Sequence, residues 1–279
     1  MTSVSADATP AANATHLPAA RLDWLPLALA PLLMLLAYPL IGSGSTWLTL
    51  TIAGLAMGMI IFVVSSGLTL VFGLMDVLNF GHGAFIALGA YIAASVLLPL
   101  APWVEADSLA LNLAVFALAI FAAMAVAGAL GLAFERVVVR PVYGQHLKQI
   151  LITMGGMIVA EQLIKAIWGP ETIALTLPAS FRGAVLLGDA AIEKYRLIAV
   201  VLGLVVFIAM LLVLNRTRIG LLIRAGVENR EMVEALGYRV RRLFVGVFAV
   251  GAGLAGMGGV LWASISRTSP RRSARRSMC

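Results

Sequence analysis

Apolar residues fill most of this chain in long stretches that short polar segments interrupt. From Trp24 to Met75 no charged residue occurs, and because a membrane-spanning helix needs about 20 residues, this stretch can hold two of them with a turn at Gly42–Ser45. Runs such as Leu109–Phe134 are apolar on every side, whereas the strands of a membrane β-barrel alternate apolar and polar residues. We therefore predict an all-α, polytopic integral membrane helical bundle. Its seven predicted transmembrane helices cover residues 25–41, 48–72, 84–100, 109–133, 149–168, 197–214 and 243–265.

The composition agrees with a membrane protein and argues against several other classes. Apolar residues make up 61% of the chain and charged residues only 12%, about half the charged fraction of soluble domains. The net charge is +7, but five arginines among the last thirteen residues supply most of it, so we expect no nucleic-acid partner. The single cysteine, Cys279, leaves no internal disulfide and no cysteine-based metal site.

The distribution of lysine and arginine predicts which side of the membrane each loop occupies. Loops 134–148 and 215–242 hold three and seven of these residues, whereas loops 42–47 and 101–108 hold none. Because short cytoplasmic loops collect positive charge, we place the first two loops in the cytoplasm and the other two outside. Alternation of the spans then places the longer polar loop 169–195 outside as well.

We divide the chain into three parts. Residues 1–23 are small and polar without periodicity and are predicted to be a disordered N-terminal segment, residues 24–265 form the transmembrane domain, and residues 266–279 form a basic tail. Seven spans would leave this tail outside, where a short basic run is unfavourable to translocate. We interpret it as a truncated or out-of-frame ending, and an anchor for lipid headgroups is the alternative.

A polar break separates the second and third predicted helices near residues 73–82. It contains Asp76, Asn79 and His82. Because unpaired polar groups are costly in hydrocarbon, such a broken or re-entrant segment persists only where protein or a water-lined cavity satisfies it. The three residues either line a substrate path through a broken helix or cap a tight cytoplasmic turn.

Glu161 and Lys165 lie four residues apart in the fifth predicted helix. An ionisable residue inside a membrane is a candidate for a functional site, which makes Glu161 our fourth candidate for the substrate path. Glutamate four residues before lysine is also the favourable order for a helical ion pair. A structural bridge near the outer interface is therefore the alternative.

Small residues recur at helix-packing spacing in two of the predicted helices. Gly54 and Gly58 lie in one, and Gly251, Ala255 and Gly259 lie in the other. Small residues let the backbones of membrane helices approach closely. We expect these positions to hold the bundle together.

Loop 215–242 contains a predicted short amphipathic helix. Glu228, Glu231 and Glu234 follow one another at three-residue spacing, which places them on one helical face, and Gly237 acts as a stop signal. The apolar residues on a second side are Met232, Val233 and Leu236. The helix is either a cytoplasmic docking element or a solvated helix whose glutamates neutralise nearby arginines.

Three stretches of the chain resemble the permease subunits of branched-chain amino acid ABC importers, which carry leucine, isoleucine and valine. They read GLTLVFGLMDVLNFGHGAFIALGAY, RPVYGQHLKQILITMGGMIVAEQL and RTRIGLLIRAGVENREMVEALGYRVRRLFVGVFAVGAGLAGMGGVLWA. The resemblance covers residues from Gly54 to Trp262 in order. It implies a multi-pass subunit of the bacterial inner membrane that forms a translocation pathway and carries out no bond chemistry itself.

The resemblance also implies partners. The stretch Glu234–Gly237 is similar to the coupling helix of ABC importers, which sits in a groove of the ATPase. The residues that we assign to ATPase coupling are Arg224, Glu228, Glu231, Glu234, Ala235 and Gly237. Cytoplasmic ATP-binding subunits, a second homologous permease subunit and a periplasmic substrate-binding protein are implied, with ATP used by the partner and no cofactor in this chain.

Other functions remain as alternatives. Related permeases for urea and short amides share much of the pattern at Asn79–Gly83. An ion-coupled secondary transporter would explain the polar breaks equally well, but it would not explain the docking helix. We predict no enzyme and no catalytic or metal site, because the chain has no Gly-x-Ser-x-Gly motif and no histidine and carboxylate pair at metal-binding spacing.

Overall fold

The structure, a computed structural model, describes residues 24–75, 77–170 and 175–265. The predictions for residues 1–23 and 266–279, a disordered segment and a truncated, out-of-frame or lipid-anchoring tail, fall outside the described residues. The helices are α1 (Trp24–Ile41), α2 (Gly44–Met75), α3 (His82–Leu97), α4 (Ala101–Val104), α5 (Leu109–Phe134), α6 (His146–Trp168), α7 (Lys194–Arg216), α8 (Arg218–Glu228), α9 (Arg230–Ala235) and α10 (Val240–Ile265). The remaining elements are the π-helical turn η1 (Glu135–Val139), the 3₁₀ turns η2 (Arg140–Val142) and η3 (Ala179–Phe181), and the strands β1 (Ala184–Leu187) and β2 (Ala190–Glu193).

Each of the seven predicted spans corresponds to a helix, namely α1, α2, α3, α5, α6, α7 and α10. Five of them in the described chain (α2, α5, α6, α7 and α10) are long and apolar enough to cross a membrane, and α3 and the apolar part of α1 are shorter. The prediction of an all-α polytopic membrane bundle is confirmed. The break between α2 and α3 lies where the sequence predicts it.

The chain divides into two units, residues 1–47 and 48–279. In the first unit, α1 is followed by a turn at Gly42, whose φ of 69° lies in the left-handed region that glycine adopts without strain. The indole Nε1 of Trp47 donates to the carbonyl of Met34 at 2.8 Å, and its ring meets that of Tyr38 edge-on at 5.8 Å. These contacts fold the start of α2 back onto α1.

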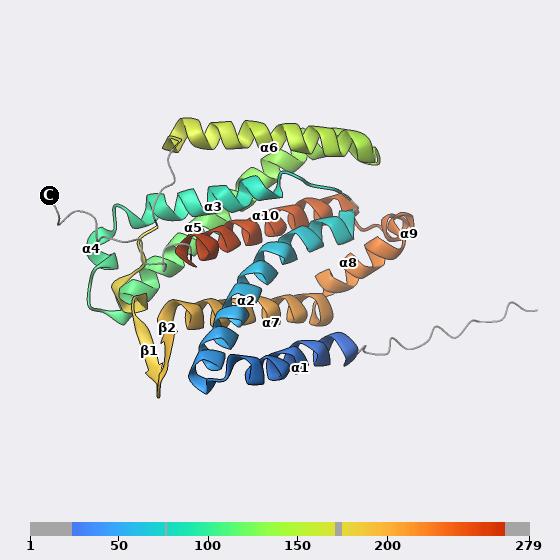
Figure 1. The fold of residues 1–279 in the computed structure, drawn as a ribbon. Helices are drawn as coiled ribbons and strands as arrows, with labels where there is room; N and C mark the ends of the chain where they lie inside the picture. Colours follow the sequence, from blue (N-terminus) through green and yellow to red (C-terminus); the bar gives the residue numbers. More distant parts are fainter. Residues whose placement is uncertain (1–23, 76, 171–174, 266–279) are drawn as a thin grey trace, which may run out of the picture. The chain divides into compact units, whose positions relative to one another are not determined.

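In the second unit, α10 lies at the centre, packed against α3 and α5 (Figure 1). Every residue from Gly251 to Leu261 is buried. Three glycines of α10 each meet the backbone of a different helix. A Cβ at Gly251 would lie 2.7 Å from the carbonyl oxygen of Gly67 in α2, and a Cβ at Gly256 would lie 2.9 Å from the carbonyl oxygen of Ala123 in α5. A Cβ at Gly259 would overlap the carbonyl oxygen of Ile86 in α3. The packing predicted for α10 is confirmed, because a side chain at these positions would push a neighbouring backbone away.

The same prediction is wrong for Gly54 and Gly58 of α2. A Cβ at either position would have no heavy atom within 4 Å among the described residues. These two glycines therefore pack no neighbouring helix in this part of the chain.

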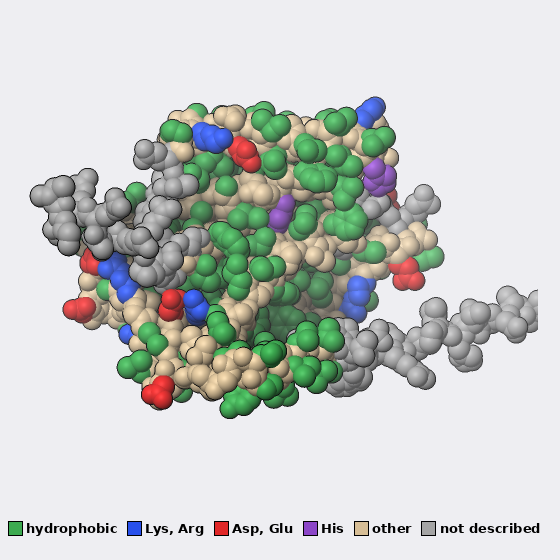
Figure 2. All heavy atoms as spheres, viewed as in Figure 1, with side chains coloured by type: hydrophobic (Ala, Val, Ile, Leu, Met, Phe, Trp, Pro, Cys, Tyr) green, Lys and Arg blue, Asp and Glu red, His purple; other side chains and the backbone are tan. Residues whose placement is uncertain are grey.

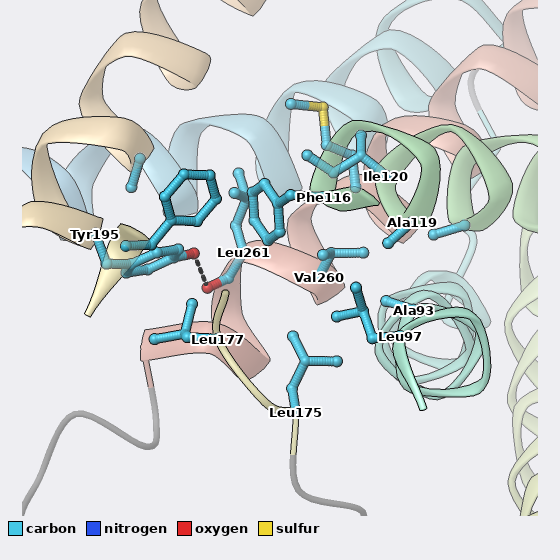
Figure 3. Close-up of a cluster of buried hydrophobic side chains, with 14 of the residues drawn as sticks. Ala93, Leu97, Phe116, Ala119, Ile120, Leu175, Leu177, Tyr195, Val260 and Leu261 are labelled. Carbon is cyan, nitrogen blue, oxygen red and sulfur yellow. Dashed lines mark hydrogen bonds between the residues drawn. The ribbon is translucent and has the colours of Figure 1, made fainter. Parts of the chain in front are cut away.

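Two apolar clusters hold the ends of the second unit. The outer cluster, in which we include Leu97, Phe116, Leu177, Tyr195 and Leu261, is fixed by a hydrogen bond from the Tyr195 hydroxyl to the Leu261 carbonyl at 2.7 Å (Figure 3). The inner cluster contains Val77 of the break, Val139 of η1, Ile223 of α8, Val233 of α9 and Phe244 of α10. Residues of loops 101–108 and 169–195 belong to the outer cluster, and residues of loops 134–148 and 215–242 belong to the inner cluster. The lysine and arginine pattern predicts that these two sets of loops lie on opposite sides of the membrane.

The predicted polar loop 169–195 contains structure that the sequence pattern does not reveal. Strands β1 and β2 form an antiparallel hairpin in which Ala184 pairs with Glu193 and Leu187 with Ala190. The loop is tied to the membrane helices by Asn112, whose Nδ2 donates to the Ser180 hydroxyl at 2.6 Å. A hairpin this short gives a weak pattern, because four residues per strand hold only two alternations.

Candidate functional site

The break between α2 and α3 is a tight turn stabilised by its own polar groups. Asn79 is buried, and its Oδ1 accepts a hydrogen bond from the backbone N–H of Gly81 at 3.0 Å. The backbone N–H of His82 donates to the Asn79 carbonyl at 3.4 Å. These contacts agree with the capping interpretation of Asn79. Asp76, the first predicted residue of this group, lies outside the described residues.

His82 connects the start of α3 to the middle of α2. Its Nε2 lies 3.0 Å from the carbonyl oxygen of Val64. A carbonyl can only accept, so Nε2 carries the proton and Nδ1 is left as an acceptor. Within the described part of the chain, this buried Nδ1 has no hydrogen-bond partner. His82 therefore offers a buried acceptor beside the break, where a substrate or a water molecule could donate to it.

Thr153 of α6 holds the break from the other side, and the sequence analysis missed it. Its hydroxyl donates to the Gln149 carbonyl at 2.7 Å and accepts from the backbone N–H of Phe80 at 3.4 Å. The carbonyl of Leu78 lies 3.3 Å from the same hydroxyl. A threonine inside an apolar helix often bonds only its own preceding turn, so sequence alone gives no sign of the contacts with the break.

Two further buried polar side chains lie near the junction of α5 and α6: Glu135 in the predicted loop 134–148, and Gln149 in the first turn of α6. Glu135 begins the π-helical turn η1, and its Oε1 accepts from the Tyr143 hydroxyl at 2.7 Å. Gln149 donates from Nε2 to the Val142 carbonyl at 3.1 Å. The second oxygen of each side chain is buried and has no hydrogen-bond partner among the described residues. Isolated π-helical turns are frequent at functional sites, so Glu135 and Gln149 join the candidates that the sequence analysis missed.

The structure does not bring Glu161 to the break. Glu161 lies eight residues beyond Thr153 on α6, about 12 Å farther along the helix axis. The described residues show no ion pair between Glu161 and Lys165, so the predicted structural bridge is absent. Lys165 is exposed and Glu161 is half-buried.

An apolar cleft of about 440 Å³ begins at the break and runs between α3, α5 and α6. Its lining includes Gly81, Phe85, Leu88, Phe134 and Ile164. The cleft lies within the size range of pockets that hold small organic ligands. It places an apolar surface directly beside the polar groups of the break.

The predicted coupling helix is two helices, α8 and α9. Asn229 separates them in an extended conformation with φ of −152°, and its Oδ1 accepts from the backbone N–H of Met232 at 2.9 Å. The prediction that Glu228 shares a helical face with Glu231 and Glu234 is therefore wrong, because Glu228 ends α8 before this N-cap. Gly237, with φ of 87°, follows α9 as predicted.

The side chains of the coupling segment divide into buried anchors and an exposed surface. Ile223 of α8 and Val233 of α9 are buried in the inner cluster together with Val77 of the break. The exposed predicted residues are Arg224, Glu228, Glu234, Ala235 and Gly237, and the side chain of Glu231 is not among those described. The apolar cluster thus connects the exposed surface of α8 and α9 to the break between α2 and α3.

Comparison with known proteins identifies the same family along most of the chain. The sequence model of the family described as the permease component of the branched-chain amino acid transport system matches residues 50–275. The high-affinity branched-chain amino acid transport system permease protein BraD of Pseudomonas aeruginosa is 30% identical over 213 residues, which cover 75% of this chain and 68% of BraD. The corresponding proteins named LivH from Salmonella typhimurium and Escherichia coli are each 27% identical over 214 residues, with the same coverage. No solved structure gives a significant match.

Hydrophobic side chains cover much of the exposed surface of the described chain, including the exposed surface of α6 (Figure 2). Such a surface suits a lipid environment rather than water. The family match over residues 50–275 and the similarity to BraD, together with a helical bundle suited to a membrane, show that this chain belongs to the family of membrane permease components of branched-chain amino acid transport systems.

Proposed function

We propose that this chain is the transmembrane permease subunit of an ABC importer for branched-chain amino acids in the bacterial inner membrane. The observation that carries the proposal is the burial of Ile223 and Val233 in the same cluster as Val77. This cluster gives a force applied to α8 and α9 a direct route to the break. The names of BraD and LivH support the choice of substrate class.

In this proposal the partner subunits supply the energy for transport, and this chain supplies the gate of the translocation pathway. A cytoplasmic ATP-binding subunit would receive the exposed face of α8 and α9, with Arg224, Glu228, Glu231 and Glu234 near the contact. A second, similar permease subunit would complete the pathway, and a periplasmic protein would deliver the substrate. We propose no cofactor in this chain, since ATP would be used by the partner.

The substrate path is proposed to pass the break. His82 has an acceptor atom available there, whereas the Oδ1 of Asn79 is already bonded to Gly81. The adjoining cleft has an apolar lining, which suits an aliphatic side chain better than it suits urea. Asp76 and Glu161 remain proposed members of the path, and Glu161 would act at a separate point nearer the outer end of α6.

Replacement of Val233 by serine tests the route from the coupling segment to the break. Val233 is 5% exposed, so the serine hydroxyl would be buried among apolar groups and would weaken the attachment of α9. We expect ATP-driven leucine uptake by the reconstituted complex to fall roughly tenfold, which corresponds to about 1.4 kcal/mol, while the complex still assembles and hydrolyses ATP.

The matched control is Val201→Ser on α7, where the valine is 58% exposed. It should leave uptake within about twofold of the unmodified complex, because surface substitutions change little. Equal uptake by the Val233→Ser complex and the unmodified complex would contradict the proposed route.

A further inference from the structure

An apolar groove of about 510 Å³ lies between α7 and α10. Val206, Met210 and Val213 line it on α7, and Gly246 and Val250 line it on α10. The groove has the volume of a small-molecule pocket. Its lining also includes Leu70 of α2, Met124 of α5 and Ile223 of α8. Because most of these helices are apolar enough to cross a membrane, its occupant would be a molecule of the bilayer.

The groove extends from the cytoplasmic end of α10 past the middle of the membrane. Its lining runs from Arg242 to Met257, a rise of about 22 Å along the helix. One leaflet contributes about 15 Å of hydrocarbon. An acyl chain from the cytoplasmic leaflet would therefore fill about two thirds of the length of the groove.

Two arginines lie at the cytoplasmic end of the groove. Arg242 is the one charged residue in its described lining, and Arg224 lines an adjoining hollow of about 290 Å³ that shares Leu70 and Ile223 with the groove. The Arg224 guanidinium donates to the carbonyl of Leu214 near the end of α7. Within the described chain, neither arginine forms an ion pair. Basic pockets between membrane helices on the cytoplasmic side favour anionic headgroups.

We propose that the groove between α7 and α10 binds one anionic phospholipid of the cytoplasmic leaflet, with an acyl chain between Val213 and Val250 and the phosphate at Arg242 and Arg224. The bound lipid would fill the space that separates α7 from the central helix. The bound lipid would also contact α8 at the start of the coupling segment, because Ile223 of α8 lines the groove. This site is separate from the break and from the proposed substrate path.

Native mass spectrometry of the full chain in mild detergent tests the proposal. The protein would be incubated with equal amounts of phosphatidylglycerol and phosphatidylcholine that carry identical acyl chains. We expect one phosphatidylglycerol to be retained per chain in preference to phosphatidylcholine. Arg242→Gln should lower this preference about fivefold, the contribution of one arginine near an anionic membrane surface.

Gly246→Leu tests the acyl-chain part of the site. A Cβ at Gly246 meets no heavy atom within 4 Å, so leucine would project into the groove without displacing the backbone. Retention of both lipids should fall in this variant. The matched controls are Arg239→Gln, an exposed arginine outside the groove lining, and Gly155→Leu, whose Cβ on α6 also meets open space; both should retain lipid as the unmodified chain does.

Three results would overturn the proposal: equal retention of the two lipids by the unmodified chain, an equal loss of preference in Arg239→Gln and Arg242→Gln, or full retention in a folded Gly246→Leu variant. If Gly246→Leu does not fold, the two arginine variants decide, because both side chains are exposed and their replacement leaves the packing intact.

Discussion

The central helix α10 and the peripheral helix α6 are both apolar enough to cross a membrane, but they are held in opposite ways. In the most apolar part of α10, 72% of the residues are buried within the chain, against 11% in α6. Glycines let α10 approach three other helices, whereas α6 exposes large side chains such as Leu151, Leu163 and Ile167. Backbone contact thus builds the core of the bundle, and apolar character alone does not determine which helix is central.

The attachment of α6 depends on a few polar contacts near its ends. Thr153 bonds the break in the first half of α6, and the indole of Trp168, the last residue of α6, donates to the Ser95 hydroxyl of α3 at 2.7 Å. The apolar face between these contacts suits lipid or the second permease subunit that we propose. Substitutions in the two helices should therefore differ sharply in effect.

The largest effect is expected for Gly256→Leu in α10. A Cβ at Gly256 would lie 2.8 Å from the Ala127 methyl and 2.9 Å from the Ala123 carbonyl oxygen, so leucine would force α5 away from α10. The free energy of unfolding in detergent should fall by more than about 3 kcal/mol, or the protein should fail to fold. The matched variant is Gly155→Leu in α6, where the Cβ meets open space. It should change the free energy of unfolding by less than about 0.5 kcal/mol. Similar losses in the two variants would remove the distinction between the helices.

Thr153→Val should have an intermediate effect. Valine keeps the shape of threonine but cannot accept from the Phe80 N–H, so a backbone donor of the break loses its partner. We expect a loss of about 1 to 2 kcal/mol, with faster amide hydrogen exchange at Phe80. Unchanged exchange at Phe80 would show that Thr153 does not hold the break.

Trp168→Phe should have a smaller effect at the other end of α6. Phenylalanine keeps an aromatic ring near Tyr91, whose ring lies 5.6 Å from that of Trp168, but it loses the hydrogen bond to Ser95. Because this bond is exposed, we expect a loss of about 0.5 kcal/mol in unfolding measurements. A loss as large as that of Thr153→Val would mean that both ends anchor α6 equally.

The smallest effect concerns an exposed ion pair in the outer loops. The Arg182 guanidinium donates to both carboxylate oxygens of Glu105 at 2.7 and 3.0 Å, which holds the pKa of Glu105 below its ordinary value of 4.5. A lowered folded-state pKa contributes stability that is present above the ordinary value and is lost as the pH falls through the lowered value. Proteolysis of loop 169–195 should therefore accelerate slightly when the pH drops below about 4.5, and Glu105→Gln should remove this pH dependence. A variant that keeps the same acid response would show that another group is responsible.

The helices of the bundle were predictable because their apolar runs are long and polar or charged segments separate them. Close helix packing at Gly251, Ala255 and Gly259 of α10 was also predicted from their spacing. The division of the coupling segment at Asn229 was harder to foresee. Its glutamate spacing fits one continuous helix, and only the local bond from Asn229 Oδ1 to the Met232 N–H shows that a new helix starts there.

The polar site was only partly predictable. Asn79 and His82 are conspicuous because they interrupt an apolar run. Glu135 and Gln149 lie beside helix ends, where polar residues are ordinary, and Thr153 is of a type that often bonds only its own preceding turn. Thr153 contacts Leu78 of the break, which is 75 residues away in sequence, and Glu135 and Gln149 bond residues eight and seven positions away in the connection between α5 and α6. Sequence periodicity carries no information about such partners.

The most direct test of the proposed function is leucine uptake into proteoliposomes that contain this chain. We predict uptake only when the ATP-binding subunits, the second permease subunit, the binding protein and ATP are all present, with no effect of an uncoupler. Uptake by this chain alone, without nucleotide, would contradict the account.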